Sequence, residues 1–123
     1  MFWLKKKKAE NLDLILADRE DYIAILSKIV LYLQHWAYYG QAEVVEKLIE
    51  LLTQENLEQF SKLLNSIDMW GGSGAVWEVY IDDPEGAKLF QKEMIRLIDL
   101  MEKTKALGRG IKQIREFFES QLH

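Results

Sequence analysis

The sequence contains no cysteine. It therefore has no disulfide framework, no thiolate nucleophile and no zinc–thiolate site, and this absence fits the reducing cytoplasm, where we expect the protein. Histidine is scarce as well, because only His35 and His123 occur and neither belongs to an H-E-x-x-H pattern or a histidine pair. Metal sites with histidine ligands need such partners at helical spacing, so we expect no metal and no cofactor.

Long apolar runs are also missing. Asp, Glu, Lys or Gln interrupts every apolar stretch within a few residues, whereas a membrane-spanning helix needs about 20 apolar residues. A secretory signal is not expected either, because the basic run Lys5 to Lys8 follows the first apolar residues instead of preceding an apolar segment. We therefore do not expect the chain to cross a membrane.

The chain has no excess of positive charge. It carries 16 basic and 20 acidic residues, a net charge of −4. Residues 9–87 contain 4 basic and 15 acidic side chains, whereas residues 88–123 contain 8 basic and 5 acidic ones. Duplex binding relies on Lys and Arg to neutralise phosphates, so this balance argues against a nucleic-acid ligand. An acidic body instead favours rapid association with a basic partner.

A length of 123 residues predicts one domain, because a chain of this size buries about two thirds of its unfolded surface. We expect a flexible basic tail over residues 1–10 and a single helical domain over residues 11–123. Residues 11–18 stay ambiguous between helix and strand, since Leu12, Leu14 and Leu16 alternate as in a strand.

Apolar residues at intervals of three and four predict a series of amphipathic helices. Asp83 and Pro84 form a strong start signal for one of them, and Gly40 is placed to end another. The short connections favour antiparallel neighbours, so the expected fold is all-α, a bundle of four long helices plus one or two short ones. The expected helices cover about residues 19–39, 41–53, 54 or 56 to 67, 84–107 and 111–122.

The middle of the chain breaks this helical pattern. Residues 69–81 read M-W-G-G-S-G-A-V-W-E-V-Y-I and hold three of the seven glycines and two of the four tryptophans. Glycine adopts backbone angles that other residues resist, which predicts a structural turn that positions Trp70 and Trp77. β-branched and aromatic residues over 75–81 favour a short extended segment, with a helical turn as the alternative. The glycines of the predicted turn are Gly71, Gly72 and Gly74.

Catalytic patterns are incomplete around these glycines. Ser73 lies within one residue of a G-x-S-x-G nucleophile elbow, but an elbow needs a preceding strand and a nearby histidine and acid. Here a helix is predicted before the serine, and His35 is the one histidine before the terminal residue. A phosphate-binding loop would need a following Lys-Ser or Lys-Thr, which is missing. We therefore expect no catalytic residues and no enzyme activity.

The segment from Gly71 to Val79, G-G-S-G-A-V-W-E-V, resembles a family of small uncharacterised bacterial helical domains. The shared pattern is two glycines, a variable residue, a third glycine, a small residue and an apolar residue, followed by a polar and an acidic position. Glu78 matches the acidic position, whereas Trp77 stands where the family favours a small polar side chain. The resemblance implies a small bacterial helical protein and carries no activity with it.

The leading hypothesis is a non-enzymatic protein-binding module, comparable to an immunity or antitoxin protein that covers a basic partner. Acidic groups would steer the partner toward the surface, and exposed aromatic side chains would anchor it at the centre of the interface. The residues expected to bind the partner are Trp70, Trp77, Glu78, Tyr80, Asp82 and Asp83.

Two alternatives stay open. A small enzyme or ligand-binding domain would have a pocket beside the glycine turn, with Glu78 as its acid or base. A membrane-surface adaptor would use Phe2, Trp3 and the lysine run that follows them. A homo-oligomer is compatible with each of these functions.

Overall fold

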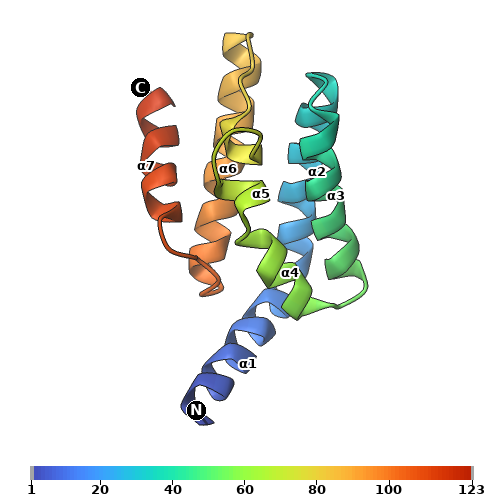
Figure 1. Ribbon diagram of the computed structural model, residues 1–123, viewed down its shortest axis with the longest axis vertical. Coiled ribbons are helices and arrows are strands. Elements are labelled where there is room, and N and C mark those ends of the chain that lie inside the picture. The colour runs from blue at the N-terminus through green and yellow to red at the C-terminus, as the bar shows by residue number, and fades with distance from the viewer. Residues whose placement is uncertain (1, 123) are drawn as a thin grey trace.

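The computed structural model describes residues 2–122, with side chains from Glu10 onward, and all regular structure in this range is helical (Figure 1). The predicted all-α class is therefore confirmed, and the helices form a bundle. No helix of the described range is long and apolar enough to span a membrane. In chain order the elements are α1 (Phe2–Ala17), α2 (Arg19–His35), α3 (Tyr39–Thr53), α4 (Leu57–Leu64), α5 (Ile67–Trp70), the 3-10 turn η1 (Val76–Glu78), α6 (Pro84–Lys103) and α7 (Ile111–Leu122).

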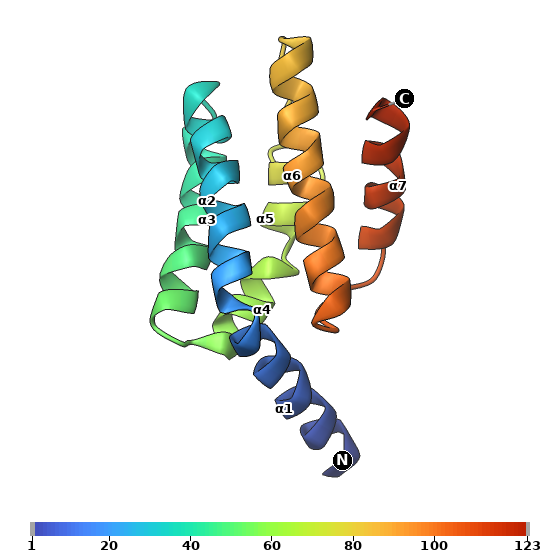
Figure 2. The same ribbon diagram turned by 180° about the vertical axis from the view of Figure 1, so that it is seen from behind.

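The long helices run up and down beside one another (Figures 1 and 2). α2 and α3 form an antiparallel hairpin, α6 packs against α2, and α7 packs chiefly along the outer side of α6. The short elements α4, α5 and η1 carry the chain from the hairpin to the start of α6. This layout places the η1 segment and α7 on the same side of the bundle.

The connection between α2 and α3 corrects one prediction. Gly40 does not end α2, because it lies in the first turn of α3. Ala37 ends α2 instead, with a positive φ of 65°. The N–H of Ala37 donates to the Gln34 carbonyl at 3.1 Å, and the N–H of Tyr38 donates to the Leu33 carbonyl at 2.8 Å. This pair of hydrogen bonds is the Schellman helix end, in which glycine usually takes the left-handed position.

Two other predicted helix ends also shift. The segment 54–67 is divided into α4 and α5, because α4 stops at Leu64 and a new turn begins at Ile67. The Asn65 side chain lies at this break and donates to the carbonyl groups of Ser61 and Ala106, at 3.1 and 3.0 Å. α6 stops at residue 103 instead of 107, where the chain turns through Lys105 with a φ of 58°.

The first helix settles the ambiguity over residues 11–18. α1 runs from residue 2 to residue 17, so the segment is helical up to the turn at Asp18. Ile15 is completely buried, and α1 contacts α4. The backbone of residues 2–10 is helical, and the flexibility expected for residues 1–10 stays a prediction.

The segment after the glycines is not one continuous extended stretch. Ala75 and Val79 have extended backbone angles, but a 3-10 turn over Val76–Glu78 separates them, which is the helical alternative. Val76 is completely buried beneath this turn. An extended segment gains its stability from pairing with a neighbouring strand, and the described part of the chain contains no strand to pair with.

The start of α6 follows the sequence prediction. Asp83 caps the helix, because its Oδ2 accepts a hydrogen bond from the Gly86 N–H at 2.8 Å, and Pro84 occupies the first helical position. Gly86 is buried against the end of α2. A Cβ at this position would lie 2.9 Å from Cζ2 of Trp36, so glycine lets the two helix ends approach closely.

Tyr22 lies at the centre of the core. Its side chain is completely buried, and its hydroxyl shares a 2.7 Å hydrogen bond with Oγ1 of Thr104 at the end of α6. Its ring packs edge-on against Phe60 of α4, with ring centroids 5.3 Å apart. Burial raises the pKa of Tyr22 to about 12, although the hydrogen bond to Thr104 acts in the opposite direction. One side chain thus connects α2, α4 and α6.

Candidate functional site

The glycines at residues 71–74 differ in what the backbone requires of them. The Ala75 N–H donates to the Gly72 carbonyl at 3.0 Å and closes a four-residue turn, in which Gly74 has a φ of 91°. A Cβ at Gly71 would lie 2.6 Å from the carbonyl oxygen of Ile67, whereas a Cβ at Gly72 would have no neighbour within 4 Å. Position 71 therefore requires glycine because a Cβ would clash, and position 74 favours glycine because of its positive φ. Position 72 can accept a larger residue.

We expect the Gly74→Ala substitution to lower the free energy of unfolding by about 1–2 kcal/mol, because an L-residue is strained at positive φ. The same change at Gly72, which has open space and no positive φ, is the matched control and should stay within about 0.5 kcal/mol of the wild type. Urea unfolding of both variants measures the difference. Equal losses at the two positions would contradict this account of the turn.

Both tryptophans beside the turn are half-buried and have their indole N–H bonded to the backbone. Nε1 of Trp70 donates to the Leu64 carbonyl at 2.6 Å, and Nε1 of Trp77 donates to the Gly71 carbonyl at 2.7 Å. A buried indole N–H needs such a partner. These bonds fix each ring against the chain six residues earlier, so neither tryptophan is a freely moving surface group.

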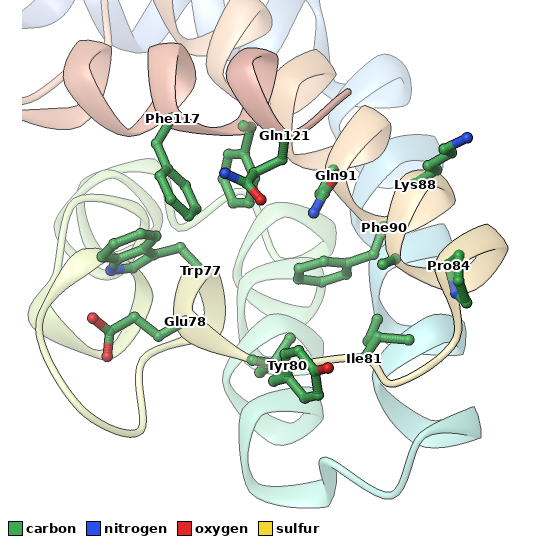
Figure 3. A pocket seen from close by; sticks show the side chains of 13 residues that line it. Trp77, Glu78, Tyr80, Ile81, Pro84, Lys88, Phe90, Gln91, Phe117 and Gln121 are labelled. Carbon is green, nitrogen blue, oxygen red and sulfur yellow. The ribbon is translucent and has the colours of Figure 1, made fainter. Parts of the chain in front are cut away.

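A hollow of about 540 Å³ lies between the η1 segment, the first half of α6 and the second half of α7 (Figure 3). We call it the aromatic groove. Trp77 forms one of its walls and packs edge-on against two residues of α7, with ring centroids 5.8 Å from Phe117 and 6.4 Å from Phe118. The aromatic side chains that line the groove are Trp77, Tyr80, Phe90, Phe117 and Phe118.

Polar groups are few and lie at the edges of the groove. Gln91 of α6 and Gln121 of α7 stand near each other on one side (Figure 3). The side chains of Glu78 and Lys88 lie at opposite ends and point away from the hollow (Figure 3). The floor is thus apolar, and the charged groups sit where a bound molecule would leave the groove.

Three hydrogen bonds hold the η1 wall in place. The hydroxyl of Tyr38 donates to the Tyr80 carbonyl and accepts a hydrogen bond from the Tyr80 N–H at 3.2 Å. Nε2 of Gln41 donates to the Gly74 carbonyl at 3.1 Å. Both donors belong to the α2–α3 hairpin, so this hairpin positions the wall that carries Trp77 and Tyr80.

An ion-pair cluster holds the opposite wall. Nε of Arg115 on α7 donates to Oδ1 of Asp99 on α6 at 2.6 Å, and its Nη1 also bonds Glu119 on α7. The hydrogen bond to Asp99 raises the pKa of the Arg115 guanidinium. Phe118 is 98% buried beside this cluster. α7 is therefore fixed against α6 in the orientation that turns Phe117 toward Trp77.

The structure places the six residues predicted to bind a partner in different surroundings. Trp77, Glu78 and Tyr80 line the aromatic groove, and Trp70 lies outside its lining. The remaining two have local roles. Asp82 is exposed and accepts a 3.4 Å hydrogen bond from the Tyr80 hydroxyl, whereas the Asp83 carboxylate is engaged as the cap of α6.

Sequence reasoning missed the α6 and α7 walls of the groove. Phe90, Phe117 and Phe118 follow the apolar periodicity of their helices and therefore look like core residues. The neighbouring pair Phe117 and Phe118 does contain a signal, because adjacent helical residues point about 100° apart. One of the two must turn away from the core, and Phe117 is 48% exposed.

The residue types of the groove and of the nearby turn bear on the catalytic alternatives. The described residues that line the groove include no histidine, serine or threonine, and its ionisable side chains are those of Glu78, Tyr80 and Lys88. Ser73 is exposed in the turn, and the His35 ring packs edge-on against Trp36 at 4.9 Å. Within residues 2–122, no group of three or more Asp, Glu or His side chains is arranged to hold a metal ion.

No protein-family model, curated protein or solved structure matches this chain. The resemblance of Gly71 to Val79 to small bacterial helical domains stays a prediction. The function therefore has to be argued from the groove and from the charges around it.

Proposed function

We propose that the protein is a non-enzymatic binding module that receives apolar side chains of a partner protein in the aromatic groove. The groove itself carries the proposal, because five aromatic side chains from three parts of the chain line one hollow. Tyr80 is 72% exposed and Phe117 48% exposed at its edges. Clustered exposed aromatic residues mark interaction surfaces and supply much of the free energy of binding.

The charge on the η1 side of the groove favours a basic partner, although Lys88 of α6 also belongs to the lining. Residues 63–87, which include the whole η1 wall, carry five acidic side chains and no basic one. Glu78 and Asp82 are exposed beside the apolar floor. An acidic surface of this kind raises the rate of encounter with a basic protein and disfavours nucleic acid. The proposal thus fits an immunity or antitoxin-like protein that covers a basic partner in a bacterial cytoplasm.

The hydrogen bonds of the η1 wall support tight binding. Association pays for ordering the loops and side chains of an interface, and a surface that is already ordered avoids this loss. Trp77 is held by the Gly71 carbonyl, and the Tyr80 backbone by Tyr38. The η1 wall is therefore ordered before a partner binds.

The test uses Phe117→Ser, with Leu31→Ser as the matched control. Leu31 is also an exposed apolar residue, at 63%, but it lies on α2 and does not line the groove. The affinity-tagged chain is expressed in its host, and co-purifying proteins are quantified by mass spectrometry at low and high salt. We expect a stoichiometric basic protein with the wild type and with Leu31→Ser, and at least about tenfold less of it with Phe117→Ser, a loss typical of a truncated anchor. Equal recovery with all three chains would contradict the proposal.

A small-molecule site is the second candidate. Its support is the size of the groove, which falls within the range of about 300–1,000 Å³ that ligand pockets occupy, together with the amide groups of Gln91 and Gln121 at its edge. A screen of amphipathic compounds by thermal shift tests it. Stabilisation of the wild type that disappears in Trp77→Phe would favour a small ligand over a protein partner.

A further inference from the structure

The first helix projects from the bundle. Figures 1 and 2, seen from opposite sides, both show α1 extending beyond the lower end of the other helices. Its packing partner is α4, and Ile15 near its end is the residue buried in the core. The first turns of α1 thus lie at the end of the molecule opposite to the first half of α6 and the second half of α7, which line the aromatic groove.

The sequence of this projecting segment has two parts. Three apolar residues at positions 2–4 precede four consecutive lysines, Lys5 to Lys8. The apolar residues include two aromatic ones, and the lysines carry half of the eight basic residues found before position 88. The segment is therefore a short apolar anchor joined to a concentrated positive charge.

The aromatic groove presents the complementary surface. Its floor is aromatic. Glu78 belongs to its lining, Asp82 is hydrogen-bonded to Tyr80 of the lining, and Glu85 follows Pro84 of the lining, and we call these three acidic residues the acidic strip. All three residues of the strip are exposed. Asp82 accepts a hydrogen bond from the Tyr80 hydroxyl at 3.4 Å. Apolar floor and acidic strip therefore occur side by side, as apolar residues and lysines do in the segment 2–8.

We propose that the segment 2–8 of one copy of the chain docks in the aromatic groove of a second copy, with its apolar part over the floor and the positive charge of Lys5 to Lys8 near the acidic strip. The inference rests on the groove of the proposed function and assigns it a specific occupant. Segment and groove lie far apart within one copy, so two copies are needed. The contact joins two different surfaces, and it closes as a reciprocal pair or continues as a chain of molecules.

This docking has a consequence for partner binding. A groove filled by a second copy is closed to a basic partner, so the partner has to displace the segment. Self-association then lowers the apparent affinity for the partner as the protein concentration rises. Because exposed charges supply the steering, both events weaken as salt increases.

Sedimentation velocity of the full-length chain, over a range of concentrations and at two salt levels, tests the proposal. One variant reverses the strip with Glu78→Lys, Asp82→Lys and Glu85→Lys, and a second variant changes Lys5 to Lys8 to Glu. The control reverses three acidic residues of α3, Glu43, Glu46 and Glu50, which are exposed and do not line the groove. Circular dichroism checks that every variant is helical.

We expect the wild type and the α3 control to associate with concentration at low salt, and each charge-reversed variant alone to be monomeric. A mixture of the two reversed variants should associate again, since the lysine segment of the first variant meets the acidic strip of the second, and the glutamate segment of the second meets the lysine strip of the first. A chain that carries both sets of changes should associate as well. A wild type that is monomeric at every concentration overturns the proposal. So does association that both reversals leave unchanged.

The outcome is separable from that of the proposed function. If the chain is monomeric but still co-purifies with a basic partner in a manner that depends on Phe117, self-docking is overturned and the proposed binding module is supported. Association that follows the charge rules, without a partner that depends on Phe117, supports self-docking and counts against the binding module.

Discussion

Replacing Phe60 by Ala is expected to lower the free energy of unfolding by about 3–5 kcal/mol. Phe60 is completely buried, and its ring packs edge-on against Tyr22. The change removes this aromatic contact and leaves a cavity beneath α4, a helix of only 8 residues that has few other anchors. A loss of this size is a large part of the total stability of a small domain, about 5–15 kcal/mol.

Urea unfolding followed by circular dichroism measures this loss. Phe117→Ala is the matched control, because it removes the same side chain from a position that is 48% exposed at the groove. We expect a clearly smaller loss there. Similar losses at the two positions would mean that α4 is not fixed to the core through Phe60.

Raising the pH above 10 is expected to destabilise the wild type more than the Tyr22→Phe variant, by up to about 3 kcal/mol at the alkaline end. The pKa of Tyr22 is raised from 10.0 to about 12 in the folded protein, chiefly by burial. Between pH 10 and pH 12 the unfolded chain therefore loses this proton while the folded chain keeps it, so stability falls as the pH rises. This difference in pKa between the two states corresponds to about 3 kcal/mol.

The phenylalanine variant has no proton to lose at position 22, so its stability should fall less steeply over the same pH range. Tyr39→Phe is the control, because Tyr39 is 64% exposed and its ring is outside the core. Urea unfolding at pH 8, 10 and 11 gives the dependence of the free energy of unfolding on pH for the wild type, Tyr22→Phe and Tyr39→Phe. Parallel slopes for the wild type and Tyr22→Phe would show that the hydroxyl ionises as freely in the folded state as in the unfolded one.

The helices could be predicted because burial enforces a regular spacing of apolar residues along each of them. α7 starts at Ile111 and α6 at Pro84, as the sequence indicates. Helix ends were less predictable. The chain leaves α2, α3 and α6 through Ala37, Glu55 and Lys105, each two residues past the helix and each with a positive φ. None of these residue types signals a left-handed position. Tertiary packing imposes those turns, so local sequence cannot reveal them.

One wall of the aromatic groove could also be predicted from the sequence, and another could not. Its η1 wall could be predicted from the glycines and from Trp77 and Tyr80, because the conformation of a turn depends on residues that are neighbours in the sequence. Its α7 wall depends on how α7 rotates against α6, which the Arg115 to Asp99 hydrogen bond and the burial of Phe118 determine. These contacts join residues far apart in sequence. Whether Trp70 belonged to the same surface as Trp77 also depended on the fold.

The protein could be stabilised at three turns that follow helices, those at Ala37, Glu55 and Lys105. Each holds a residue with a Cβ in a conformation that costs about 1–2 kcal/mol relative to glycine. All three lie outside the lining of the aromatic groove. Substitutions in the groove that alter binding but lower the stability can therefore be compensated by glycine at these three positions. The binding surface can then change in sequence while the helical bundle stays folded.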